Sequence, residues 1–227
     1  MRNKFNEQLV LLNDELEAMG ALCEDVITLA CKALTESENS EYLDQIVQID
    51  REIDQQERTI ENLCLKLILH QQPVAGDLRQ ISAALKMITD MERIGDQAED
   101  IAEIIGYIGG DEDGIEIIND DILANLMENM AKSATDMVTE SVDAYVKQDV
   151  VLAQKVIDDD DIVDGLFKQV KSRLVEMIVA GPDEGGEILD FLMISKYFER
   201  IADHAVNIAE WVIYAVTGER KGELEGD

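Results

Sequence analysis

Four short features of the first half of the chain recur in the second half, in the same order and at nearly the same separation. The two prolines, Pro73 and Pro182, are 109 residues apart. Three acidic or apolar motifs recur at separations of 110, 107 and 107 residues: Asp50-x3-Asp54 and Asp160-x3-Asp164, Glu92–Asp96 and Glu199–Asp203, Ile101–Glu103 and Ile208–Glu210. One motif can recur by chance, but four in one order indicate a duplicated structural unit.

Each half contains three long amphipathic segments with helical spacing of apolar residues. The predicted helices span residues 3–36, 41–70, 75–107, 119–148, 151–179 and 187–217. Short polar, glycine-containing or proline-containing breaks separate them. Such connections favour antiparallel neighbours, so the pattern predicts an all-α protein of two tandem antiparallel three-helix bundles. We expect one repeat over residues 1–110, another over 117–217, and a flexible tail over 218–227. The alternative is one continuous, spectrin-like rod.

Composition excludes several function classes. The chain has 50 acidic and 19 basic residues, a formal net charge of −31, which repels nucleic-acid phosphates and anionic membranes. No basic pocket is visible, so direct sensing of free phosphate is not expected. Cys23, Cys31 and Cys64 form no CxxC pair, which suits a reducing cytoplasm. No apolar run approaches the roughly 20 residues that span a bilayer, so we expect a soluble, cytoplasmic chain.

Acidic side chains form a strip along one edge of the third predicted helix. Glu92 and Asp96 lie one helical turn apart and point the same way. A hairpin that turns near residue 72 or 73 places residue 50 level with about residue 95, and residue 54 level with about residue 91. Asp50 and Asp54 are therefore predicted to lie beside Glu92 and Asp96. Three further acidic side chains are reserve candidates for the same site: Glu57, Glu99 and Asp100.

The same geometry arises in the second half. Asp160 and Asp164 of the fifth segment are predicted to meet Glu199 and Asp203 of the sixth, with Asn207 nearby. Carboxylates at one level repel one another and raise one another's pKa, unless basic partners or bound cations relieve them.

We predict that bound cations offset the repulsion between these carboxylates. Arg93 and Arg200 lie one residue off the acidic strips and are expected to point elsewhere. All-oxygen sites suit Mg²⁺, Mn²⁺, Ca²⁺ or iron rather than structural zinc. We therefore predict two metal sites, whose ligands could instead be mixed between the halves if the bundles pack face to face. The alternative interpretation is a solvated acidic flank without metal.

Three motifs of the first half and one of the second carry a resemblance to a known family. They are Gln72-Pro73-Val74-Ala75-x-Asp77-Leu78-Arg79, Ala84-Leu85-Lys86, Asp90-x-Glu92-Arg93-Ile94-Gly95-Asp96, and Glu199-Arg200-Ile201-Ala202-Asp203-His204. In these motifs, and in its tandem repeat, the chain resembles the PhoU family of phosphate-signalling proteins. The resemblance implies two bundles related by pseudo-twofold symmetry. It also implies multinuclear clusters of iron or of other divalent ions such as manganese, magnesium or zinc.

The resemblance further implies an adaptor rather than an enzyme. Such a protein damps the phosphate-starvation response by linking the ATPase subunit of the phosphate ABC transporter to the phosphate-sensor histidine kinase. Two departures from the first repeat imply that the two metal sites need not be equivalent. The second half has no counterpart of the Ala75–Arg79 motif, and Tyr197 stands where the first half has Asp90.

Two other function classes stay open, a carboxylate-bridged metal enzyme and a metal-free helical scaffold. Neither His70 nor His204 belongs to the Glu-x-x-His motif of di-iron bundle enzymes, which argues against an oxygen-activating oxidase. We expect His204 to be exposed or interfacial. The sixth segment is apolar over more than half of its helical wheel, through residues such as Leu192, Val206 and Ile213, and this predicts a homodimer.

Overall fold

The computed structural model describes residues 2–36, 39–71, 73–109, 120–181 and 185–219. Within these ranges the chain forms six helices and no strand: α1 Arg2–Thr35, α2 Asn39–Gln71, α3 Ala75–Gly109, α4 Asp121–Lys147, α5 Val150–Ala180 and α6 Gly185–Thr217. The predicted all-α fold and its six helices are confirmed. None of the helices in the described ranges has an apolar stretch suited to crossing a bilayer. Residues 110–119 of the central break and 220–227 of the predicted tail lie outside the described residues.

Aspartate caps set the starts of the two helices that follow the central break. The side chain of Asp120 accepts a hydrogen bond of 2.8 Å from the N–H of Leu123 at the start of α4. Asp149 accepts two, at 2.9 and 3.0 Å, at the start of α5. Each such cap stabilises a helix by about 0.5–2 kcal/mol. Gln148, with φ of 52°, ends α4 in the left-handed conformation, so α5 turns back at once.

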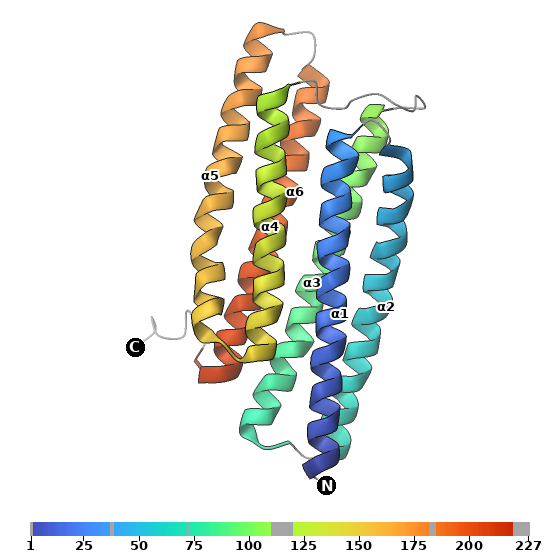
Figure 1. The fold of residues 1–227 in the computed structure, drawn as a ribbon, viewed down its shortest axis with the longest axis vertical. Helices are drawn as coiled ribbons and strands as arrows, with labels where there is room; N and C mark the ends of the chain where they lie inside the picture. Colours follow the sequence, from blue (N-terminus) through green and yellow to red (C-terminus); the bar gives the residue numbers. More distant parts are fainter. Residues whose placement is uncertain (1, 37–38, 72, 110–119, 182–184, 220–227) are drawn as a thin grey trace.

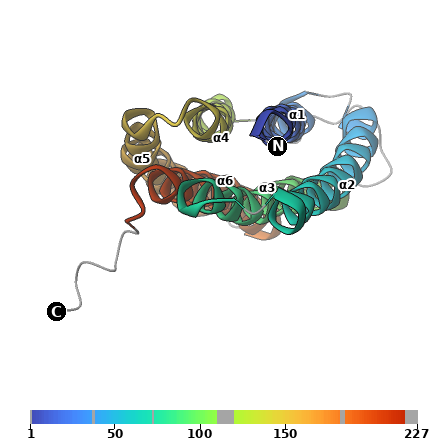
Figure 2. The same ribbon diagram turned by 90° about the horizontal axis from the view of Figure 1, so that it is seen from below.

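The two halves lie side by side (Figure 1). Helices α1, α2 and α3 contact one another, and so do α4, α5 and α6. Across the junction α3 contacts α6 and α1 contacts α4, whereas α2 and α5 lie at opposite outer sides (Figure 2). Helix α2 ends and α3 begins at one end of the molecule, whereas α5 ends and α6 begins at the opposite end, as a pseudo-twofold relation requires. The continuous-rod alternative is therefore wrong.

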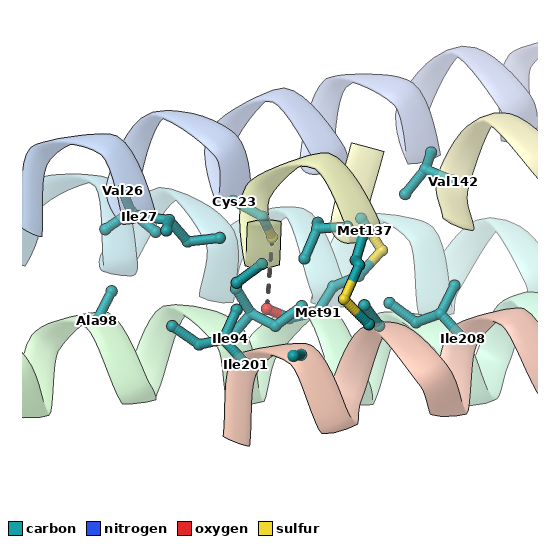
Figure 3. Close-up of a cluster of buried hydrophobic side chains, with 14 of the residues drawn as sticks. Cys23, Val26, Ile27, Met91, Ile94, Ala98, Met137, Val142, Ile201 and Ile208 are labelled. Carbon is teal, nitrogen blue, oxygen red and sulfur yellow. Dashed lines mark hydrogen bonds between the residues drawn. The ribbon is translucent and has the colours of Figure 1, made fainter. Parts of the chain in front are cut away.

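One apolar core crosses the junction between the halves. Side chains from α1, α3, α4 and α6 meet there (Figure 3): Cys23, Val26, Ile27, Met91, Ile94, Ala98, Met137, Val142, Ile201 and Ile208, all of them buried. The thiol of Cys23 donates a hydrogen bond of 3.5 Å to the carbonyl oxygen of Met91, and burial raises its pKa to about 12. Gly20 lets α1 approach α4, because a Cβ there would lie 3.2 Å from Cγ2 of Val142.

The broad apolar arc of α6 is covered within the chain. This helix contacts α3, α4 and α5, and its residues Leu192, Val206 and Ile213 are half-buried against the core. The side-by-side arrangement therefore covers part of the surface on which the dimer prediction depends, while Leu189, Met193 and Val216 of α6 stay exposed. Dimerisation stays a prediction.

Removing a core side chain at the junction should destabilise both halves together. We expect Ile201→Ala to lower the free energy of unfolding by about 2–5 kcal/mol, because it leaves a cavity in the shared core. The matched change Ile162→Ala, at a side chain 54% exposed on α5, should change it by no more than about 0.5 kcal/mol. Urea denaturation followed by circular dichroism measures both. Equal effects of the two variants would contradict a core that crosses the junction.

Candidate metal centres

The first carboxylate cluster lies where α2 and α3 run antiparallel. Helix α2 supplies Asp50 and Asp54, and α3 supplies Glu92 and Asp96. An ideal Cβ on Gly95 would lie 2.8 Å from Oδ1 of Asp50, closer than real Cβ contacts allow. Glycine at position 95 therefore leaves the space that the Asp50 carboxylate occupies. It also shows that residue 50 lies level with residue 95, which confirms the predicted register of the hairpin.

Burial and neighbouring carboxylates raise the pKa of several carboxyl groups in and beside this cluster. Burial raises the pKa of Asp50 to about 6, and the charges of Glu99, Asp96, Asp54 and Glu92 contribute in that order. Burial followed by neighbouring carboxylates also raises the pKa of three further groups: Glu57, Glu92 and Glu99. The structure thus brings the four predicted ligands into one electrostatic environment, with Glu57 and Glu99 at its edge.

Two arginines already neutralise part of this cluster. Nη2 of Arg58 lies 3.1 Å from Oδ2 of Asp54. Arg93 lies 2.7 Å from Oδ2 of Asp96 through Nη1, and 3.4 Å from Oε2 of Glu92 through Nε. The expectation that Arg93 points away from the strip is wrong, because its long side chain reaches along the helix to both acids. Oε2 of Glu92 is nevertheless buried and accepts no hydrogen bond from the described residues.

The second cluster repeats the arrangement between α5 and α6. Burial raises the pKa of Asp160, and the charges of Asp203, Asp164 and Glu199 add to this effect. Burial and Glu199 also raise the pKa of Asp203, opposed in part by Lys196. The four predicted residues of the second half are therefore close enough to interact, as the hairpin geometry predicted.

Lysine side chains, rather than arginines, neutralise part of the second cluster. Nζ of Lys168 lies 3.3 Å from Oδ2 of Asp164, and Lys196 forms an ion pair with Glu199. Arg200 does not join them, because its guanidinium lies over the ring of Tyr197, 5.5 Å from its centroid. The buried Ala202 occupies the place that corresponds to Gly95 in the first half. The two clusters are therefore not equivalent.

A polar bridge joins α3 to α6 beside both clusters. Oδ1 of Asp90 lies 2.9 Å from Nδ1 of His204 and accepts a hydrogen bond of 3.0 Å from Asn207. Tyr197, which corresponds to Asp90 in the repeat, hydrogen-bonds to Asp100. His204 is interfacial, as expected. Asn207, predicted to lie near the second site, and the reserve residue Asp100 both form hydrogen bonds at this junction. Sequence reasoning missed the role of Asp90, although its mismatch with Tyr197 was the available signal.

The donor atoms suit a hard cation, but the side chains do not converge on one point. Among the described residues, no group of three or more His, Cys, Asp or Glu side chains is arranged to hold a metal ion. Carboxylate oxygens are the ligands that Mg²⁺, Mn²⁺, Ca²⁺ and iron accept. The buried Oε2 of Glu92 accepts no hydrogen bond from the described residues, but Nε of Arg93 lies 3.4 Å from it. Arg93 occupies one carboxylate oxygen of Asp96 and lies beside one of Glu92, so it competes with any cation at the first cluster.

The metal-free protein should become more stable as the pH falls from 7 to 5. The folded-state pKa of Asp50, about 6, exceeds that of an unfolded aspartate, so the folded state binds more protons in this window. The free energy of unfolding should rise by on the order of 1–2 kcal/mol. Asp50→Asn should flatten this dependence, and Asp44→Asn, at an exposed position of α2, should not. Urea denaturation in a chelator at both pH values checks this, and an unchanged slope in Asp50→Asn contradicts it.

The sequence matches a family model in both halves. The PhoU domain model matches residues 16–105 and 127–212. A protein of Clostridium acetobutylicum named phosphate-specific transport system accessory protein PhoU homolog is 35% identical over 220 residues, which cover 96% of this chain and 97% of that protein. A protein of the same name from Pseudomonas aeruginosa is 32% identical over 219 residues, covering 95% and 86%.

Solved structures match the fold over nearly its full length. The crystal structure of PhoU from Pseudomonas aeruginosa has a TM-score of 0.84 at 33% identity, covering 95% of this chain and 100% of that one. The regulatory protein PhoU from Streptococcus pneumoniae, at 23% identity and a TM-score of 0.81 over 96% and 99%, shows the likeness of fold alone. The chain therefore belongs to the PhoU domain family, whose model it matches once in each half.

Proposed function

We propose that this protein is a cytoplasmic, non-catalytic regulator of phosphate uptake and of the phosphate-starvation response. Its relatives in Clostridium acetobutylicum and Pseudomonas aeruginosa are named accessory proteins of a phosphate-specific transport system, and not enzymes. The observation that carries the proposal is the same four-carboxylate cluster in each half of a chain with two PhoU domain matches.

In this proposal the protein links the ATPase subunit of the phosphate ABC transporter to the phosphate-sensor histidine kinase, and keeps the starvation response low when phosphate is plentiful. The net charge of −31 supports association with basic patches on partner proteins, at rates that salt reduces. Helices α2 and α5 face opposite outer sides of the molecule (Figure 2). Two partners can therefore contact the chain at once.

The proposal includes hard metal ions at the two carboxylate clusters. Asp50, Asp54, Glu92 and Asp96 would hold one ion or ion cluster, and the second half would use its own four: Asp160, Asp164, Glu199 and Asp203. A bound cation neutralises the mutual repulsion of these carboxylates. The aspartates of α2 and the acids of α3 would then share one charge centre, as would those of α5 and α6. The raised pKa of Asp50 supports this role, because burial and the neighbouring carboxylates make its negative charge unfavourable and a bound cation would offset this.

Metal content should depend on the first cluster. In protein purified without chelator, Glu92→Gln combined with Asp96→Asn should reduce bound metal to about half of the wild-type content, because one of two oxygen-ligand sites is lost. The control Asp44→Asn with Glu52→Gln removes the same charge from exposed positions of α2. Arg93→Gln should strengthen divalent-ion binding by about 10-fold, since it removes a competing cation. Elemental analysis and metal titration measure these effects, and unchanged content in the double variant contradicts the first site.

Loss of the gene should derepress the phosphate-starvation response. In a strain without any other PhoU-domain gene, deletion should leave alkaline phosphatase expression high in phosphate-rich medium, and the wild-type gene should restore repression. Complementation with the Glu92→Gln, Asp96→Asn variant tells whether the cluster is needed for signalling. Normal repression after deletion would show that the chain does not have this role.

A further inference from the structure

Exposed apolar side chains gather where α2 ends and α3 begins, at the end of the molecule that also holds the start of α1 (Figure 1). Four large apolar side chains at this end of the α2–α3 hairpin are between 41% and 73% exposed: Leu65, Leu69, Val74 and Leu78. None of the four packs in the core or belongs to a carboxylate cluster. Apolar side chains that gather on the surface of a soluble protein mark interaction sites, and the proposed function assigns no role to this end of the molecule.

These side chains continue the helix faces that carry the first carboxylate cluster. On α2, Leu65 follows Asp54 by 11 residues, which is three helical turns. On α3, Leu78 precedes Asp96 by 18 residues, which is five turns. Because the two acids belong to one cluster, the two leucines lie on the same side of the hairpin, nearer to its end. One surface about 25 Å long therefore joins the cluster to the exposed apolar end.

The face of α2 between the cluster and the apolar end adds further acids. Glu57 and Glu61 lie one helical turn apart on it. Burial, followed by the charges of Glu61 and Asp54, raises the pKa of Glu57, so these three acids form one strip. Arg58 and Arg93 pair with acids of the cluster, but two cations do not balance the four cluster acids together with the two glutamates. The surface is therefore acidic at one end and apolar at the other.

The corresponding surface of the second half is apolar without the same charge. At the separation of 110 residues that relates α2 to α5, two exposed valines take the places of the two leucines of α2: Val175 and Val179. Lys171, which is exposed, stands where α2 has Glu61. Lys168 and Lys196 add positive charge beside the second cluster. An occupant with basic groups is therefore suited to the α2–α3 hairpin rather than to the α5–α6 hairpin.

We propose that the surface from the first carboxylate cluster to the end of the α2–α3 hairpin binds a basic amphipathic helix of a partner protein. Apolar side chains of that helix pack on Leu65, Leu69 and Leu78, and its Lys or Arg side chains pair with Glu57 and Glu61. Two antiparallel helices offer a third helix a regular packing surface, and about 25 Å corresponds to about 17 helical residues. The inference rests on the proposed function, which requires a partner protein, and it adds the chemistry of the partner's segment.

Two other occupants fit this surface less well. A second copy of the chain, placed across a twofold axis, would bring two acidic strips close together, at a net charge of −31 for each chain. A membrane with anionic lipids would be repelled by the same strip. Charge complementarity therefore favours a basic partner whose apolar side chains cover the exposed end of the hairpin.

Fluorescence anisotropy of a labelled synthetic peptide, titrated with the full chain in about 0.15 M NaCl, tests the proposal. The probe is an Ala-rich helical peptide of about 18 residues, with Leu along one face of its first half and Lys along the same face of its second half. It should bind at least about 10-fold more tightly than a peptide of the same composition in scrambled order. It should exceed by the same factor a peptide with Glu in place of Lys, which the acidic strip repels.

Removing the most exposed apolar side chains should weaken this binding. Leu69→Gln combined with Val74→Gln should lower the affinity for the probe by about 10-fold or more, because less apolar surface is buried in the complex. The matched control is Val151→Gln with Ile162→Gln on α5, at the opposite outer side of the molecule, where the side chains are 80% and 54% exposed. It should change the affinity by less than about 2-fold.

A charge reversal tests the acidic end of the surface. Glu61→Lys gives α2 the residue type that α5 has at the corresponding place, and it should weaken binding of the probe by about 10-fold or more. Glu52→Lys makes the same change at an exposed position on the opposite face of α2, and it should weaken binding by less than about 3-fold. Circular dichroism checks that each variant is folded.

The proposal is overturned if the probe binds no more tightly than its scrambled or acidic counterpart, or if either the folded apolar variant or folded Glu61→Lys binds it as the wild type does. It is also overturned if light scattering shows that the apolar variant converts a dimer to a monomer, because a second copy would then cover this surface. Failure of the probe to bind would leave the proposed function intact. Normal repression of alkaline phosphatase after gene deletion would overturn that function without changing peptide binding.

Discussion

The contact between α3 and α6 is the interaction on which the rest of the structure depends. Both helices carry an apolar arc that includes small buried residues, such as Ala98, Ala202 and Ala205, so their backbones can approach closely. Helices α1 and α4 cover this pair and contact each other at Gly20. Each fully buried large apolar side chain contributes about 1.5–3 kcal/mol. The shared core orients the two central helices, and their acidic edges meet α2 on one side and α5 on the other.

The two carboxylate clusters lower the stability that the apolar core provides. Carboxylates held at one level by the hairpins repel one another, and burial adds to the penalty, as the raised pKa of Asp50 shows. Arg58 and Arg93 offset part of this repulsion in the first half, and Lys168 and Lys196 do so in the second. Clusters of mutually repelling carboxylates at corresponding places of a duplicated fold are typical of functional sites, where residues needed for binding lower the stability of the fold.

The two halves share a fold and differ in detail. Gly95 admits the Asp50 carboxylate, whereas Ala202 stands at the corresponding place of the second half. Asp90 accepts hydrogen bonds from α6, whereas its counterpart Tyr197 interacts with Asp100 of α3. Because of these residue differences, the contacts between α3 and α6 differ on the two sides of the pseudo-twofold axis. The two sides of the junction between the halves therefore differ chemically.

The sequence by itself determined the six helices, the two hairpins in each half and the carboxylates that share a level. Helical periodicity and the position of a turn are local properties, so residue 50 could be placed beside residue 95 from spacing alone. The sequence did not determine the direction of the Arg93 side chain, because a long rotatable side chain adapts to whichever acids surround it. Only the tertiary structure decided that the halves lie side by side and that Asp90 meets His204. These features join residues more than 60 positions apart, whose proximity follows from how the two halves bury their apolar arcs and not from any local pattern.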